Sequence, residues 1–290
     1  MENNYSKHLF ELCLATLFIS TSGALGKFID MPPPVIIWWR SALGALFLYV
    51  YCRYKKVDLK LKSRKDITTF FLGGLFLGAH WVTYFYALKL SNVALGMLSL
   101  YTFPVITALL EPFFIKVKLN PIHIVLGLLV LLGIYILAPE INFKSTYLKG
   151  ILLGVLSALF YALRLLILKR HVYNYNGTML MFFQLLIVAV LLAPTLFFMD
   201  TSNIASQYPY VLILALVTTT IGHTMMVQSL KYFSVSTASI ISSVQPIFGI
   251  IIAFFFLSEI PTWNTFFGGL LILATVIIES IRSKNVVKAK

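Results

Sequence analysis

The sequence predicts an all-α polytopic membrane protein with ten transmembrane helices, arranged as two inverted repeats of five helices. Hydrophobic residues make up 59% of the 290 residues and charged residues only 11%, whereas ordinary soluble domains are about one quarter charged. The apolar residues form runs long enough to cross a bilayer as helices. The chain also repeats itself at one constant spacing, that between Lys89 and Lys231, which we call the repeat spacing.

The repeat is clearest in the two segments that contain these lysines. Residues 87–93 read ALKLSNV and residues 229–235 read SLKYFSV, so Leu, Lys and Val recur in register. A proline follows at the same distance in both, as Pro104 and Pro246. Matches of Lys and Pro are more informative than matches of Leu in such an apolar chain. This repeat divides the chain into two structural units, residues 1–142 and 143–290.

Each repeat contains five apolar spans separated by polar or helix-breaking residues. The expected spans are 8–29, 33–52, 67–88, 92–115, 121–138, 148–169, 178–198, 208–230, 236–257 and 262–281. Pro32–Pro34 separate the first two spans, and Pro121 and Pro261 open the fifth and the tenth, because proline is tolerated in the first turn of a helix. The first span carries Glu11 and lacks a small-residue cleavage site, so we expect it to be retained.

The loop charges predict the orientation of the chain. Seventeen Lys and Arg residues fall in loops on the side of the N-terminus and three in loops on the other side. Positive residues concentrate on the cytoplasmic side, so we expect both termini in the cytoplasm, at a bacterial-type inner membrane. The net charge of +13 therefore reflects topology, and basic and aromatic residues are not interleaved as in a nucleic-acid interface. An odd number of helices per repeat inverts the second repeat, which is typical of transporters with a midplane site.

The two cysteines, Cys13 and Cys52, lie near expected cytoplasmic span ends and are predicted to be free thiols. They form no metal motif, and no cofactor is expected. The alternative to a carrier is a membrane-embedded enzyme or a non-transporting membrane protein of unknown activity. For an enzyme, the H-E-x-x-H, paired-aspartate and G-x-S-x-G motifs are missing from the sequence. The expected partners are the lipid bilayer and a small-molecule substrate. The chain is expected to be a monomer, with a dimer as the alternative.

Taken together, these features resemble the EamA-type branch of the drug/metabolite transporter superfamily over essentially the whole chain. The features that carry the resemblance are the two five-helix units and the residues Pro32–Pro34, Arg40, Pro104, Pro246, Glu259 and Pro261. The first repeat has Val117 where the second has Glu259, so any role of that glutamate is confined to one repeat. The resemblance implies a secondary carrier that works by alternating access. It also implies export of small organic metabolites, such as amino acids or related amphiphilic solutes, although a fold defines cargo poorly.

Nine polar or aromatic residues on the spans are candidates for substrate contact. They are Trp39, Arg40, His80, Tyr84, Tyr101, Tyr161, His223, Ser243 and Gln245. Arg40 lies too deep to reach the interface, so it either binds an anionic group of the substrate or locks neighbouring helices together. His80 and His223 contact substrate or couple protons, or they bond to neighbouring helices. Close helix packing explains the serines around Ser243 without any ligand.

Four further residues are candidates for gating. Glu111 and Arg164 lie about one turn from the cytoplasmic ends of their spans, and they either pair as an inner gate or extend separately to the interface. Pro104 and Pro246 interrupt the fourth and ninth spans. Each proline frees a backbone carbonyl, which is tolerated where a neighbour or cavity water satisfies it. These two positions are therefore predicted hinges.

Overall fold

Every regular element that the structure describes is helical. This computed structural model describes residues 2–64, 66–114, 121–137, 144–169, 171–233, 238 and 241–288. Its helices are α1 (Glu2–Phe28), α2 (Pro33–Tyr54), α3 (Asp66–Leu90), α4 (Val93–Leu100), α5 (Phe103–Phe114), α6 (Pro121–Leu137), α7 (Thr146–Lys169), α8 (Gly177–Leu192), α9 (Thr195–Phe198), α10 (Ile204–Ile213), η1 (Leu214–His223), α11 (Thr224–Ser229), α13 (Gln245–Leu257) and α14 (Trp263–Lys288). The predicted all-helical class is confirmed.

The helices coincide closely with the predicted spans. Within the described ranges, seven helical stretches are long and apolar enough to cross a membrane, and three shorter helices are also apolar. Each of these stretches overlaps one predicted span. Parts of three spans, at residues 115, 138, 236–237 and 239–240, lie outside the described residues.

Local signals explain where several helices begin. Pro33 and Pro34 occupy the first turn of α2, where a missing backbone N–H costs nothing. Asn92 caps α4, because its side chain accepts a hydrogen bond of 2.8 Å from the Leu95 N–H. Asn176 caps α8 in the same way, through the Thr178 N–H at 2.8 Å. An Asn at this position satisfies one of the N–H groups left free at a helix start.

The eighth predicted span is not a plain α-helix, because its centre, η1, is a π-helix. The hydroxyl of Thr219 donates to the Leu214 carbonyl and that of Thr220 to the Ala215 carbonyl, both five residues back and both at 2.8 Å. Thr21 on α1 also bonds to Thr218 at 2.8 Å. Short π-helical stretches are frequent at functional sites, and η1 packs against both α1 and α2 in this bundle.

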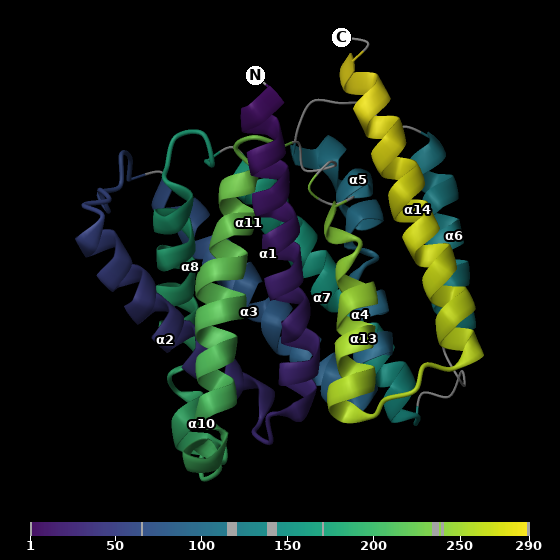
Figure 1. Ribbon diagram of the computed structural model, residues 1–290, viewed down its shortest axis with the longest axis horizontal. Helices are drawn as coiled ribbons and strands as arrows, with labels where there is room; N and C mark the ends of the chain where they lie inside the picture. The colour runs from purple at the N-terminus through teal and green to yellow at the C-terminus, as the bar shows by residue number, and fades with distance from the viewer. Residues whose placement is uncertain are drawn as a thin grey trace.

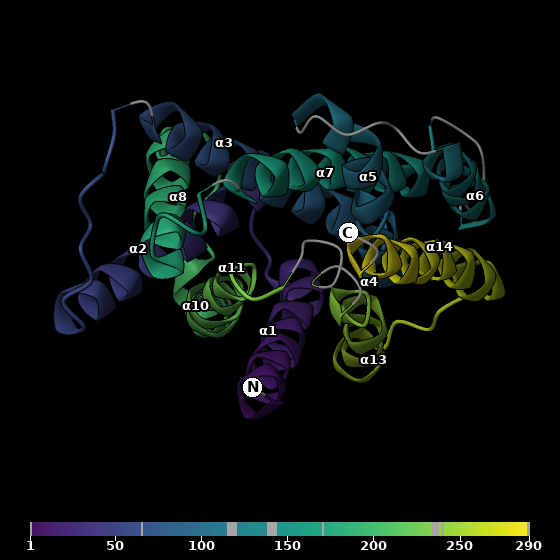
Figure 2. The same ribbon diagram turned by 90° about the horizontal axis from the view of Figure 1, so that it is seen from above.

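The helices form a flattened bundle with two lateral pairs. The α2–α8 pair lies at one side and the α6–α14 pair at the other, while α1, α3, α7 and α13 lie between them (Figures 1 and 2). Glycines permit the closest crossings. A Cβ atom at Gly154 of α7 would lie 2.5 Å from the Cβ of Ser99, and one at Gly268 of α14 would lie 2.8 Å from the Gly133 carbonyl. Such small residues let membrane helices approach closely.

Both chain termini lie at the same end of the bundle (Figure 1). We call this the terminal end, and we call the opposite end, where α1 finishes at Phe28, the distal end. Ser91 at the distal end contacts both the end of α1, through Lys27, and the start of α7, at Gly150. Helices α1 and α7 therefore run in opposite directions.

Candidate functional site

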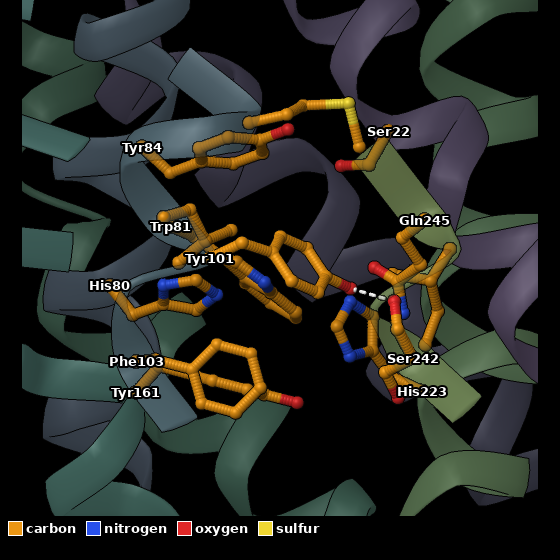
Figure 3. A pocket seen from close by; sticks show the side chains of 13 residues that line it. Ser22, His80, Trp81, Tyr84, Tyr101, Phe103, Tyr161, His223, Ser242 and Gln245 are labelled. Carbon is orange, nitrogen blue, oxygen red and sulfur yellow. Dashed lines mark hydrogen bonds between the residues drawn. The ribbon is translucent and has the colours of Figure 1, made fainter. Parts of the chain in front are cut away.

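A cavity of about 30 Å³ lies between α1, α3, α4, α5, α7, η1 and α13. Its lining is aromatic with a few polar tips, from tyrosine, histidine, serine and glutamine side chains (Figure 3). An apolar cavity with few well-placed polar groups is the usual form of a small-molecule site. Such sites measure about 300–1,000 Å³, so this cavity has to expand before it can hold a metabolite.

Six of the nine predicted substrate-contact residues line this cavity. They are His80, Tyr84, Tyr101, Tyr161, His223 and Gln245. Trp39, Arg40 and Ser243 are not among the lining residues, and Ser242 lines the cavity in place of Ser243. The helix is interrupted here, so helical spacing alone does not show which of the two serines faces the cavity, and the assignment of Ser243 to substrate contact stays a prediction.

His80 is fixed between α3 and α7 by a reciprocal pair of hydrogen bonds. Its Nδ1 lies 2.7 Å from the hydroxyl oxygen of Ser157, and that hydroxyl donates to the His80 carbonyl at 2.7 Å. A hydroxyl has one proton to donate, so it accepts from Nδ1–H in this arrangement. Nε2 is then the acceptor nitrogen of the neutral ring. Tyr161 and Tyr84 flank the ring, with centroids 4.7 and 6.2 Å away.

The two proline-interrupted helices meet at the cavity. Pro246 has no N–H to bond the carbonyl of Ser242 four residues earlier. The hydroxyl of Tyr101 donates to that carbonyl at 2.5 Å (Figure 3). Tyr101 lies at the break between α4 and α5, where Pro104 follows. The freed carbonyl is thus satisfied by the other interrupted helix, as the sequence argument requires of a proline in a membrane helix.

Arg40 contacts the cavity wall through Trp81 rather than directly. Its guanidinium carbon lies 3.9 Å from the centroid of the Trp81 ring, and its Nε donates to Thr219 at 2.9 Å. Trp81 lines the cavity and packs edge-on against His223 at 5.2 Å. Arg40 is fully buried, and Nη1 and Nη2 have no hydrogen-bond partner among the described residues. The helix-locking and anion-binding alternatives for Arg40 are both compatible with these contacts.

Arg164 and Glu111 lie in unlike surroundings. Arg164 is 1% exposed, and its Nε donates to Gln184 at 2.6 Å. Glu111 is exposed, and no ion pair joins it to Arg164 among the described residues. The expectation that Arg164 extends to the interface is therefore wrong, because α8 packs over it. The structure does not bring the two predicted gate residues together.

At the distal end, α1 and α3 are joined by a reciprocal pair of lysines, Lys27 and Lys89, which we call the distal clamp. Lys27 Nζ donates to the carbonyls of Lys89 and Ser91 at 3.2 and 2.8 Å. Lys89 Nζ donates to the carbonyls of Lys27 and Ile29 at 2.9 and 2.5 Å. Cations near the C-terminal carbonyls of helices are favourable, so each lysine caps the helix that carries the other.

Glu259 adds a second contact at the distal end. Its Oε2 accepts a hydrogen bond of 2.8 Å from the Val93 N–H, at the start of α4. Burial raises the pKa of this carboxyl above its ordinary value, while the Val93 N–H and the charge of Lys27 oppose the rise. Glu259 thus ties the loop after α13 to the first turn of α4.

The terminal end is hollow, in contrast to the distal end. A cavity of about 420 Å³ opens there between the start of α1, the segment that leads into α8, and α11 with the residues that follow it. Its lining includes Lys7, Glu11, Gln228 and Lys231. Lys231 is the repeat counterpart of Lys89, but it is exposed and its Nζ makes no hydrogen bond within the described part of the chain.

Sequence reasoning missed several of these residues. Trp81 and Ser242 line the cavity without having been chosen, although Trp81 and His223 are equivalent positions at the repeat spacing. The sequence shows Lys89 only as part of the repeat and assigns no role to Lys27. The partners of the distal clamp are backbone carbonyls, which leave no trace in the side-chain sequence. The recurrence of lysine at the repeat spacing was the one available signal.

Comparison with known proteins identifies relatives along the whole chain. Residues 7–138 and 148–281 each match the model of the EamA-like transporter family. The pseudopaline exporter CntI of Pseudomonas aeruginosa is 26% identical over 280 residues, covering 94% of this chain and 95% of the relative. The uncharacterized transporter YxxF of Bacillus subtilis is 24% identical, covering 97% and 91%. A crystal structure of a protein with 19% identity aligns with a TM-score of 0.70, covering 97% and 99%, which shows a shared fold.

Proposed function

The chain belongs to the EamA-like transporter family and is a multi-pass membrane transporter, and we propose that it exports small organic solutes by alternating access. The proposed architecture has ten membrane spans in two inverted repeats, residues 1–142 and 143–290. The proposed cargo is an amino acid or a related amphiphilic solute. The exporter CntI, named for pseudopaline, supports the direction of transport at 26% identity.

The composition of the central cavity is the observation that carries this proposal. Eight of its lining residues form four pairs whose members are separated by the repeat spacing: Ile19 and Tyr161, Trp81 and His223, Leu100 and Ser242, and Phe103 and Gln245. A cavity lined by equivalent positions of both repeats lies on the axis that relates them. Inverted-repeat transporters bind their cargo at this interface, near the membrane midplane.

Packing between the helices supports the inverted repeat independently. The counterpart of α1 is α7, that of α2 is α8, and that of α3 is the α10–η1–α11 stretch. Helix α1 packs on η1 and α11, and its counterpart α7 packs on α3. Helix α2 packs on η1, and its counterpart α8 packs on α3. In the same way, α1 packs on α13, and its counterpart α7 packs on α4 and α5. Each of these contacts between the repeats thus has an equivalent with the roles exchanged.

The difference between the two ends supports alternating access. The distal clamp closes one end, while the 420 Å³ cavity opens at the other. Because the terminal end is the expected cytoplasmic side, we assign this conformation to the inward-facing state. Both termini are then cytoplasmic, and the membrane is the bacterial-type inner membrane.

The proposed roles of individual residues follow from their positions. The six predicted residues that line the cavity are assigned to substrate contact, Arg40 lies behind the wall through its contact with Trp81, and Trp39 and Ser243 keep their proposed role in substrate contact. Pro104 and Pro246 are assigned to hinges, because they interrupt the two helices that meet at the cavity. Glu111 and Arg164 form an inner gate only if a second conformation brings them together. A monomer contains the whole cavity, so it is the proposed functional unit, with a dimer as the alternative.

Counterflow in proteoliposomes tests the proposed function. Purified protein is reconstituted and loaded with each member of a panel of amino acids, purines and organic cations, and uptake of the labelled solute is followed. We expect exchange of at least one solute class, reduced by Tyr101→Phe and by His223→Gln. Repeating the assay across pH with His80→Gln and His223→Gln tests proton coupling at these rings. Absence of counterflow for every solute, with folded protein in the vesicles, would refute the proposal.

A further inference from the structure

Two arginines are the only charged side chains buried in the interior that the structure describes. Arg40 is 0% exposed and Arg164 is 1% exposed. No ion pair joins either of them to a carboxylate among the described residues. No aspartate or glutamate lines the central cavity. Buried charges are normally paired, so this interior carries an uncompensated positive charge.

The contacts of Arg40 leave most of its hydrogen-bonding capacity unused. Only Nε has a bond, to the neutral hydroxyl of Thr219, while Nη1 and Nη2 are buried without a partner among the described residues. A guanidinium offers five N–H donors in a fixed fork that matches an oxyanion. The Trp81 ring stabilises the cation from one face but does not neutralise it.

Arg164 is held by neutral groups as well. Nε donates to the Gln184 side chain at 2.6 Å, and Nη2 lies 3.7 Å from the sulfur of Met181. Its guanidinium carbon lies 5.8 Å from the centroid of the Tyr161 ring, which lines the cavity. Trp81 belongs to the first repeat and Tyr161 to the second, so the two cations lie behind walls contributed by different repeats.

Resting on the function proposed above, we propose that the central cavity takes solutes that carry a carboxylate or a similar oxyanion. In a weakly polarisable interior, two uncompensated cations attract an anion and repel a cation much more strongly than in water. The neutral tips of the lining, such as Gln245 and the tyrosines, then orient the rest of the solute. A purely cationic cargo meets no negative group anywhere along the described wall.

The test compares acids with their uncharged or cationic analogues in the unmodified protein. Proteoliposomes are assayed for counterflow with amino acids and short dicarboxylic acids, each paired with its amide and with the corresponding amine. We expect each transported acid to exceed its amide by about tenfold or more, because Coulomb attraction at several ångströms in the interior is worth at least one decade in binding. Equal fluxes of acid and amide would overturn this inference and leave the transport proposal standing. Absence of flux for acids, amides and amines alike would overturn both.

Variants locate the positive charge that selects the acid. Arg40→Gln and Arg164→Gln should lower the acid-to-amide flux ratio, whereas a purely structural role would lower both fluxes together and leave the ratio unchanged. Arg53→Gln, at an exposed position on the same helix as Arg40, is the matched control and should preserve the ratio. If either buried-arginine variant fails to fold, the thermal unfolding of the unmodified protein is measured with added acids and with added amides. We then expect acids, and not amides, to raise the midpoint of unfolding. Equal protection by both would overturn the inference.

Discussion

Replacing Lys89 with methionine should open the distal end of the transporter. The substitution keeps the apolar length of the side chain and removes the ammonium, which donates to the carbonyls of Lys27 and Ile29 at 2.9 and 2.5 Å. The bonds that Lys27 makes in return remain. Half of the distal clamp is therefore lost, and the packing of α1 against α3 is unchanged.

The size of the effect follows from the two bonds that are removed. A hydrogen bond involving a charged group contributes about 1.5–3 kcal/mol, but the half-buried clamp is partly screened by water, so about 1 kcal/mol per bond is reasonable. The distal end should thus be destabilised by about 2 kcal/mol. Since about 1.4 kcal/mol corresponds to a factor of ten, the population open at the distal end should rise roughly thirtyfold.

Accessibility of a single cysteine measures this shift. Ser22 lines the cavity, so Ser22→Cys is introduced after Cys13 and Cys52, both free thiols, have been replaced by serine. A membrane-impermeant maleimide added from the distal side should label the Lys89→Met variant up to about thirtyfold faster than its parent. Lys231→Met is the matched control, because Lys231 makes no clamp in this conformation. An unchanged labelling rate from the distal side would refute the assignment of the clamp as a gate.

Three further changes test the architecture through the midpoint of thermal unfolding in detergent. Tyr101→Phe leaves the carbonyl freed by Pro246 without a donor and should cost about 1–3 kcal/mol; an unchanged midpoint would contradict this. Gly154→Ala places a Cβ 2.5 Å from that of Ser99 and should cost about 1–3 kcal/mol, whereas Gly127→Ala, with its nearest contact at 3.6 Å, should be neutral. Glu259→Gln keeps an acceptor for the Val93 N–H. Burial raises the pKa of Glu259 above 4.5, so the folded state binds this proton more tightly than the unfolded state does. The ionised carboxylate therefore lowers the stability of the fold near neutral pH. This loss of stability is relieved as the pH falls through the raised pKa. The glutamine variant should therefore gain most at neutral pH, and a pH-independent difference would contradict the assignment.

The helices could be predicted from the sequence because their signals are local. Span length follows from runs of apolar residues, and starts follow from residues such as Pro33 and Asn92, whose effect depends only on nearby backbone. Six of the nine residues chosen for substrate contact, among them His80, Tyr101 and Gln245, line the cavity, and they were chosen as polar or aromatic residues within apolar spans. These inferences need no knowledge of which helix packs on which.

The remaining features depend on contacts between distant segments, so no local pattern announces them. Arg164 is buried because Gln184 and Met181 of α8 cover it, and its distance from a span end gave the opposite expectation. Within the π-helix η1, the Thr219 hydroxyl donates to the Leu214 carbonyl and accepts from Arg40, which lies on the distant helix α2. The sequence of η1 alone is compatible with an α-helix.

The two repeats place equivalent residues in unlike surroundings, and this difference defines the conformation of the protein. Lys27 and Lys89 correspond to Lys169 and Lys231 at the repeat spacing. The first pair is joined by reciprocal bonds, whereas Lys231 borders an open cavity and Lys169 lies 5.5 Å from the ring of Tyr173. If the repeats exchange conformations, as inverted repeats do in alternating access, the second pair closes the terminal end when the first pair opens. The lysines that mark the repeat in the sequence are then the two gates, of which this structure holds one closed.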